Sequence, residues 1–137
     1  MTDVSDDLVQ PFLIEASGLR GRLIRMGPVV NEVISRHDLP SVVQGLMAEF
    51  IVVATALSAA LKFEGIFTLQ AKGNGPVSLL AADITSEGGV RAYASVGKDI
   101  PTTEHIKGSP VPRLLGAGYL AFTVDQGDHA ELYQGIV

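Results

Sequence analysis

The 137-residue sequence contains no cysteine. This absence excludes a disulfide framework, a thiol nucleophile and a thiolate metal site within these residues. Charged residues are few as well, at 18%, whereas apolar residues make up 47%. The ten basic and fifteen acidic residues leave a net charge of −5. Because this charge opposes broad electrostatic attraction to nucleic acid or to an anionic membrane, we expect neither as a partner.

The sequence also lacks a recognisable leader and a long hydrophobic run. Asp3, Asp6 and Asp7 stand where a secretory signal would carry positive charge. The longest apolar run, residues 50–61, has twelve residues. This is well short of the roughly 20 residues that span a bilayer, so a buried helix is favoured. We therefore expect one cytoplasmic domain with a single core.

Hydrophobic periodicity predicts an α+β fold with antiparallel sheets and a long central helix. Residues 28–37 have the spacing of a short helix, near whose end His37 is a candidate cap. Residues 42–62 predict a helix of about twenty residues that is apolar almost all round in its second half, with Ser41 as N-cap. Alternating apolar residues predict strands at residues 8–16, 18–27, 66–72, 77–85, 90–96, 119–127 and 131–137.

The Gly-Asn-Gly-Pro stretch at residues 73–76 lies between two of these strands. A phosphate loop would lead from a strand into a helix, whose N-terminal N–H groups face the anion. Here a second strand follows Pro76, so the stretch is interpreted as a hairpin turn. The sequence therefore gives no support to a nucleotide-binding enzyme.

The last third of the chain is less regular. Residues 98–118 are rich in proline and glycine and are expected to contain one helical turn, at residues 111–115. Connections of this length are often functional or mobile. The chain ends at Val137 within a predicted strand, without a turn or a polar tail. We therefore expect a truncated domain whose last strand is an open edge.

A cluster of arginines is the most distinctive charged feature. Arg20, Arg22 and Arg25 lie on the second predicted strand. A solvated strand face is the favoured interpretation, with a small anion site as the alternative. An enzyme would require these arginines to converge with Glu64 or Asp125 in a cleft.

The other polar candidates form no catalytic or metal-binding motif, so no catalytic, cofactor-binding or metal residue is assigned. Lys62 and Glu64, between the long helix and the next strand, are expected to form an ion pair or to contact a partner. Asp83 is interpreted as a solvated strand-end charge rather than one of an acid/base pair. The three histidines lack the spacing of metal ligands: His37, His105 and His129. No serine lies in the strand-to-helix turn that a serine nucleophile requires: Ser58, Ser78, Ser86 and Ser109.

Several sequence blocks, taken in order, resemble a known family. The blocks are LKFEGIFTLQAKGNGPVSLLAAD (61–83), RAYA (91–94), GAGYLAFTVD (116–125) and YQGIV (133–137), preceded by the helical segment LMAEFIVVATALSAALKFEG. Their order and spacing are similar to those of the N-terminal domain of the bacterial heat shock protein 33 family, and the resemblance covers residues 9–137. It implies a three-layer β/β/α arrangement.

The resemblance also implies a function. Family members are ATP-independent holdase chaperones, which bind unfolding client proteins and prevent their aggregation. A linker and a C-terminal zinc domain with four cysteines follow in such proteins, and oxidation there releases zinc and activates the chaperone. Because residues 1–137 contain no cysteine, zinc is implied only for a longer parent protein, unless the protein lacks this switch. Residues 1–137 would then be the client-binding and dimerisation domain, with no cofactor of their own.

The composition is compatible with such a role. A mean hydropathy of +0.31 leaves more apolar residues than one small core can hide. We expect a homodimer, with strand exchange between two chains as one form of it. The alternative is a non-catalytic interaction or assembly module with one defined partner. Periodicity alone does not identify the apolar residues that contact clients.

Overall fold

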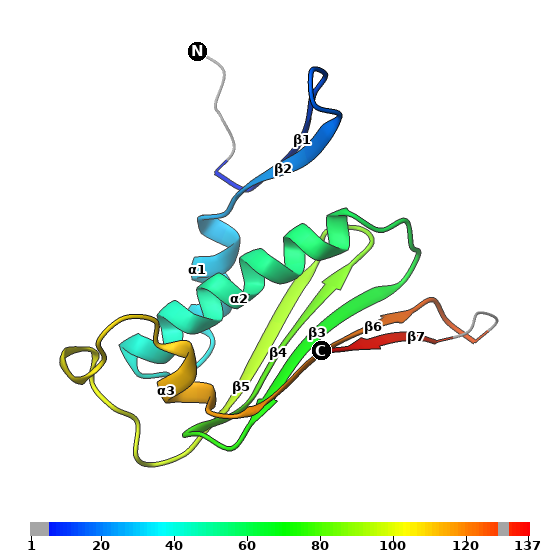
Figure 1. Ribbon diagram of the computed structural model, residues 1–137. Helices are drawn as coiled ribbons and strands as arrows, with labels where there is room; N and C mark the ends of the chain where they lie inside the picture. Colours follow the sequence, from blue (N-terminus) through cyan, green and yellow to red (C-terminus); the bar gives the residue numbers. More distant parts are fainter. Residues whose placement is uncertain (1–5, 129–131) are drawn as a thin grey trace.

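The computed structural model describes residues 6–128 and 132–137 (Figure 1). It contains a two-stranded and a five-stranded sheet, both antiparallel, and a long helix, which confirms the predicted α+β class. The elements are β1 (Leu8–Ile14), β2 (Leu19–Arg25), α1 (Pro28–Ser35), α2 (Ser41–Ala59), β3 (Ile66–Gly73), β4 (Val77–Thr85), β5 (Val90–Val96), the 3-10 helix η1 (Thr103–His105), α3 (Val111–Leu115), β6 (Gly118–Asp125) and β7 (Tyr133–Ile136).

The larger sheet has the strand order β5-β4-β3-β6-β7. Strands β3, β4 and β5 form the predicted meander, while the long connection after β5 brings β6 back beside β3. The predicted helical turn in this connection is α3, which inserts Leu114 into the core with no exposed surface.

The turn between β3 and β4 confirms the hairpin interpretation and shows why its glycines are needed. The segment that leads from α3 into β6 crosses directly over this turn. Its carbonyl groups accept hydrogen bonds from the backbone N–H groups of Asn74 and Gly75, both at 3.0 Å. A Cβ atom on Gly73 or Gly75 would lie far inside van der Waals contact of the crossing backbone. The glycines therefore allow the backbones to approach, and no helix follows that could bind a phosphate.

Helix α2 packs across one face of the larger sheet and forms the core with it (Figure 1). It is long and apolar enough to cross a membrane by length and composition. Here it is a core helix, whose buried side chains include Met47 and Ile51 packed with Phe67, Leu69 and Leu80 of the sheet. Burial of these side chains supplies the main stabilisation of the fold.

The first residue of α2 and the last residues of both helices show how far the predicted caps and bounds hold. Ser41 is the first residue of α2, and its side chain makes no capping hydrogen bond, so the predicted N-cap is wrong. The carbonyl of Pro40 accepts the first backbone bonds instead. Helix α2 ends at Ala59, before Lys62, and His37 closes α1 through its backbone N–H, which donates to the Ile34 carbonyl at 3.0 Å.

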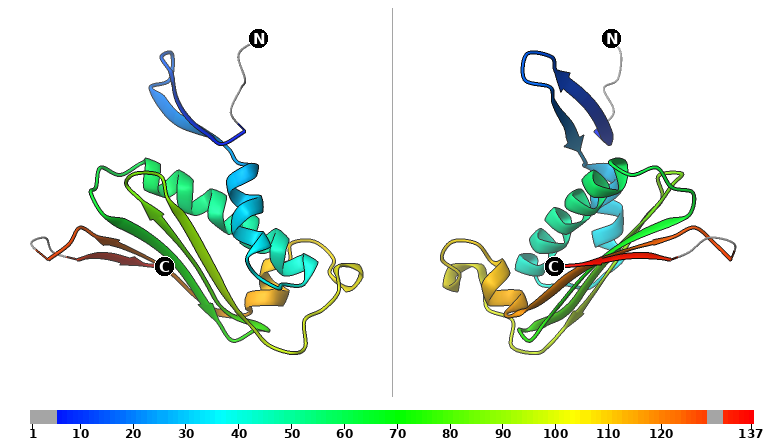
Figure 2. Two further views of the ribbon diagram at one scale, coloured as in Figure 1. Left: turned by 180° about the vertical axis from the view of Figure 1, so that it is seen from behind. Right: turned by 45° about the vertical axis from the view of Figure 1, so that its right-hand side comes forward.

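The β1–β2 hairpin stands away from the larger sheet (Figure 2). None of its strand residues is buried, so it extends beyond the helices and does not stack on the five-stranded sheet as a further layer. At its base the carboxylate of Asp7 accepts hydrogen bonds from the backbone N–H groups of Gly27 and Val29, at 3.0 and 3.2 Å. This carboxylate caps the start of α1 and joins the hairpin to the body of the domain.

Candidate functional site

The arginines of β2 do not converge with a carboxylate pair. The register of the hairpin places Arg20 and Arg22 on one face and Arg25 on the other. Arg25 forms an ion pair with Asp6 at 2.8 Å, and both side chains are more than half exposed. Arg20 and Arg22 line a shallow pocket with Pro11 and other hairpin residues, and no carboxylate lines it. These positions agree with a solvated strand face.

The three candidate carboxylates lie in separate environments. Asp83 is half-buried within β4 rather than a solvated strand end, and its carboxylate accepts hydrogen bonds from Thr68 at 2.6 Å and from Arg91. The carboxylate of Asp125 accepts the backbone N–H of Gly127 at 3.0 Å. Glu64 lines a cleft that contains neither of the other two. The geometry therefore provides no acid/base pair among them.

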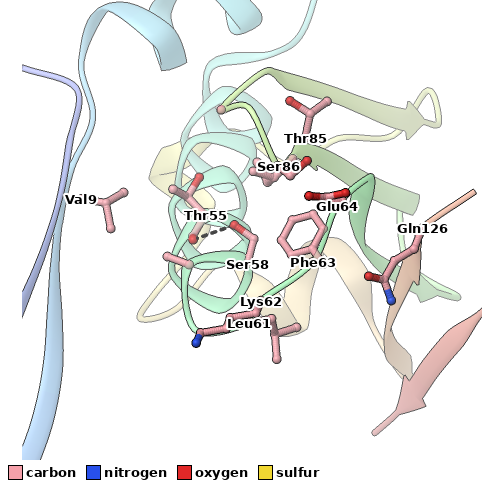
Figure 3. A pocket seen from close by; sticks show the side chains of 13 residues that line it. Val9, Thr55, Ser58, Leu61, Lys62, Phe63, Glu64, Thr85, Ser86 and Gln126 are labelled. Carbon is pink, nitrogen blue, oxygen red and sulfur yellow. Dashed lines mark hydrogen bonds between the residues drawn. The ribbon is translucent and has the colours of Figure 1, made fainter.

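This cleft has a volume of about 800 Å³ and lies between the hairpin, the end of α2 with the segment after it, and the end of β4 (Figure 3). The hydroxyl groups of Thr55 and Ser58 donate to carbonyls of the preceding turn of α2 at 2.8 and 2.9 Å, so the helix backbone satisfies them. Lys62 and Glu64 also line the cleft, but among the described residues they form no ion pair with each other. The ion pair expected at this junction is therefore wrong, and the alternative, a contact of Lys62 and Glu64 with a partner, stays a prediction.

The remaining serines and histidines serve local structure where the structure describes them. The Ser86 hydroxyl accepts the backbone N–H of Gly65, and the Ser109 hydroxyl accepts that of Val111. The Ser78 hydroxyl donates to a backbone carbonyl of β5. His105 Nδ1 lies 2.7 Å from the hydroxyl of Thr102, and His129 lies outside the described residues. Within residues 6–128 and 132–137, no three His, Asp or Glu side chains could together hold a metal ion.

The main unexplained feature of the surface is apolar. Most of the exposed large apolar side chains fall into three groups, and Val9 and Leu13 are also exposed, on the face of the hairpin that carries Arg20 and Arg22. The hairpin patch consists of Phe12, Ile14, Leu19 and Leu23, which the strand register places on one face of the β1–β2 hairpin. The helix stripe consists of Val53, Leu57 and Leu61, spaced four residues apart along and just beyond α2. The C-terminal patch consists of Leu132, Tyr133, Ile136 and Val137.

The hairpin patch is more exposed than the helix stripe, and the C-terminal patch is more exposed than either. The four side chains of the hairpin patch are 48–61% exposed and contain no charged group. Contiguous exposed apolar surface of this kind commonly marks a site of protein interaction. The C-terminal patch adjoins a groove between α2 and β6, where Phe50 and Leu120 lie near Val137. These surfaces are apolar, and among the described residues they place no nucleophile beside a base.

Comparison with known proteins now identifies the family. A family model described as "Hsp33 protein" matches residues 7–137. The chain belongs to the Hsp33 family. It is 37% identical to a 33 kDa chaperonin of Caulobacter vibrioides, covering 98% of this chain and 45% of that protein. It is 32% identical to a 33 kDa chaperonin of Escherichia coli, covering 96% and 43% respectively. The chain thus spans about half the length of these Hsp33 relatives.

A solved Hsp33 structure has the same fold. The crystal structure of a 33 kDa chaperonin from Thermotoga maritima matches with a TM-score of 0.81 and 25% sequence identity. The match covers 97% of this chain and 46% of that chain. The resemblance drawn from the sequence blocks at residues 61–83, 91–94, 116–125 and 133–137 is therefore confirmed as Hsp33 membership, over nearly all of the chain.

The sequence did not identify the hairpin patch. Residues 8–14 are apolar at almost every position, a pattern that is also typical of a strand covered on both faces. Whether such a strand is covered depends on which element packs on it, and that information lies elsewhere in the chain. The presence of Arg20 and Arg22 on the facing strand was the one available signal that this sheet is partly solvated.

Proposed function

We propose that this chain is the client-binding part of an ATP-independent holdase chaperone, without catalytic activity, that acts in the cytoplasm. Membership of the Hsp33 family, whose relatives are called chaperonins, supports a chaperone role. The observation that carries the proposal is the uncovered hairpin patch. A holdase needs apolar surface that stays accessible on a folded scaffold, and this hairpin extends from a well-packed core.

We further propose that the chain forms a homodimer. Open strand edges and exposed apolar side chains at β7 support self-association by strand pairing or exchange. Redox regulation through zinc is proposed only for a longer parent protein. The donor set of this chain does not fit zinc, because it has no cysteine and the described residues contain no three-ligand group.

An aggregation assay tests the holdase function. An unrelated client protein is heated with and without this chain under reducing conditions with EDTA, and aggregation is followed by light scattering. We expect suppression at near-equimolar amounts, because apolar surface exposed by the client is covered by the chain. A folded, charged protein of similar size is the control. If this chain, shown to be folded by circular dichroism, leaves aggregation unchanged, the proposed function is wrong. Saturable binding to one partner only would favour the interaction module.

A further inference from the structure

The β1–β2 hairpin is one strand short of a stable sheet. An isolated two-stranded hairpin is marginally stable in water, whereas a third strand or packing against a helix can stabilise it. Here β2 contacts α2 near the base of the hairpin, and no third strand is present in the described structure. Every strand residue of the hairpin is exposed or half-buried, and the hairpin patch is uncovered. A third strand beside β1 or β2 would therefore extend the ladder and cover part of this patch.

The two edges of the hairpin are not equivalent, because β1 contains Pro11. A proline fits an antiparallel ladder where its nitrogen faces away from the partner strand. The side-chain amide of Gln10 donates to the Pro11 carbonyl at 3.0 Å, which agrees with this carbonyl facing outward. The outer edge of β1 thus has no N–H at its centre, and its central carbonyl is already occupied. Proline in this position protects an edge against further pairing.

The outer edge of β2 forms no backbone hydrogen bond with another described element, although β2 lies close to helix α2. Arg22 lies opposite Pro11, and Arg20 and Ile24 lie opposite the outward-facing Leu13 and Val9. Residues opposite each other in an antiparallel pair share their orientation, so Arg20, Arg22 and Ile24 direct their N–H and C=O groups away from β1. No backbone bond joins these three residues to another described element. The edge of β2 therefore offers three uninterrupted residues for pairing.

The side chains around this edge indicate what kind of strand fits. On the apolar face, Gly21 lies between Leu19 and Leu23, and the ring of Phe12 covers it from the neighbouring strand. An apolar side chain beside Gly21 would contact this ring. On the opposite face Arg20 and Arg22 have no ion-pair partner within the described residues.

Charge on this face selects the complementary side chains. The hairpin residues 8–25 contain three arginines and one glutamate, in a chain whose net charge is −5. An added strand would place alternate side chains beside Arg20 and Arg22, where a carboxylate is favoured and a cation is repelled. The matching segment alternates apolar residues with acidic or neutral polar ones.

We propose that β2 binds an extended segment of an unfolding protein as a third strand, with its apolar side chains on the hairpin patch and its acidic or polar side chains beside Arg20 and Arg22. This inference rests on the proposed holdase function. Main-chain hydrogen bonds provide affinity for many sequences, and the two faces provide a preference among them. The four half-exposed side chains offer on the order of 300 Å² of apolar surface, against about 800 Å² per partner in a stable complex. An apolar area of this size is better suited to transient binding of a client segment than to a permanent interface with a second copy of this chain.

The experiment compares prolines at the two edges. Arg22→Pro removes an outward N–H from β2, whereas Leu13→Pro makes the matched change on the edge of β1 that Pro11 already interrupts. Arg22→Ala removes the charge and keeps the N–H. The probe is a fluorescently labelled peptide of about ten residues that alternates valine with glutamate and threonine, and binding is followed by anisotropy. Circular dichroism and thermal unfolding confirm that each variant is folded.

We expect Arg22→Pro to weaken peptide binding about tenfold or more, because a backbone bond is lost and its neighbours are displaced. Leu13→Pro should leave binding within about twofold of the unmodified chain, and Arg22→Ala should have an intermediate effect. Equal binding by Arg22→Pro and Leu13→Pro would overturn the inference, as would no binding by the unmodified chain.

The aggregation assay and light scattering separate the other outcomes. If Arg22→Pro no longer binds the peptide but the unmodified chain does not suppress aggregation, strand binding by β2 is supported and the proposed holdase function is wrong. If Arg22→Pro suppresses aggregation as well as the unmodified chain does, the holdase stands and client capture by β2 is wrong. If Arg22→Pro converts a dimer to a monomer while peptide binding is unchanged, the edge is an interface between copies and the inference is overturned.

Discussion

The strands of the five-stranded sheet and of the β1–β2 hairpin both place alternate apolar side chains on one face. Helices pack on that face of the sheet, whereas the hairpin patch is exposed. In β4 the alternate side chains Leu80, Ala82 and Ile84 are buried beneath the helices. In the hairpin Leu19 and Leu23 alternate in the same way, and both are more than half exposed. Alternation therefore defines a strand and its two faces, whereas burial depends on a second layer. The hairpin keeps apolar surface accessible because no such layer lies on it in the described structure.

Truncating one leucine in each region gives the largest expected contrast. Leu80→Ala removes a fully buried side chain and should lower the free energy of unfolding by about 2–5 kcal/mol. Leu23→Ala, at 56% exposure, should change it by less than about 0.5 kcal/mol. Urea denaturation followed by circular dichroism measures both. A large decrease in the free energy of unfolding for Leu23→Ala would show that the hairpin patch is buried in solution. That result would contradict the difference between the two regions.

Adding a methyl group to one glycine in each region should give a smaller contrast. The Cβ atom of Gly118→Ala would meet the backbone of Lys72 and Gly73 in β3, which cannot move without breaking the ladder. We expect a loss of about 1–3 kcal/mol in the free energy of unfolding. The nearest atoms to the Cβ atom of Gly21→Ala would belong to the exposed ring of Phe12, which can rotate away, so the loss should be below about 1 kcal/mol. Comparable losses in the two thermal unfolding curves would contradict this difference.

The elements of the fold could largely be predicted from the sequence, because each has a local signal. The meander, the turn at residues 73–76 and the helical turn at residues 111–115 follow from period-two alternation and from the positions of glycine and proline. The Ser41 cap could not be predicted reliably, because Pro40 starts α2 through its backbone carbonyl. The capping of α1 by Asp7 was missed as well, since it joins residues about twenty positions apart.

The candidate site was harder to predict than the fold. The sequence showed an excess of apolar residues but not which of them are exposed. That distinction depends on the path of α2, which covers the larger sheet and leaves the outer face of the hairpin free. Pro11 and Arg22 were visible in the sequence, yet their roles on opposite edges of the hairpin depend on the register that pairs them. The position of the turn sets this register, and the predicted strands at residues 8–16 and 18–27 left no room for the turn that residues 15–18 form.

The most direct test of the central claim, that the hairpin patch binds clients, removes apolar surface from one exposed region at a time. The double variant Leu19→Ser and Leu23→Ser is compared with Val53→Ser and Leu57→Ser on the helix stripe, in the aggregation assay with a heated client. The hairpin variant should require several-fold more chain for the same suppression, while the helix variant should act like the unmodified chain. If the hairpin variant suppresses aggregation at the same concentration as the unmodified chain, the hairpin patch is not the client-binding surface.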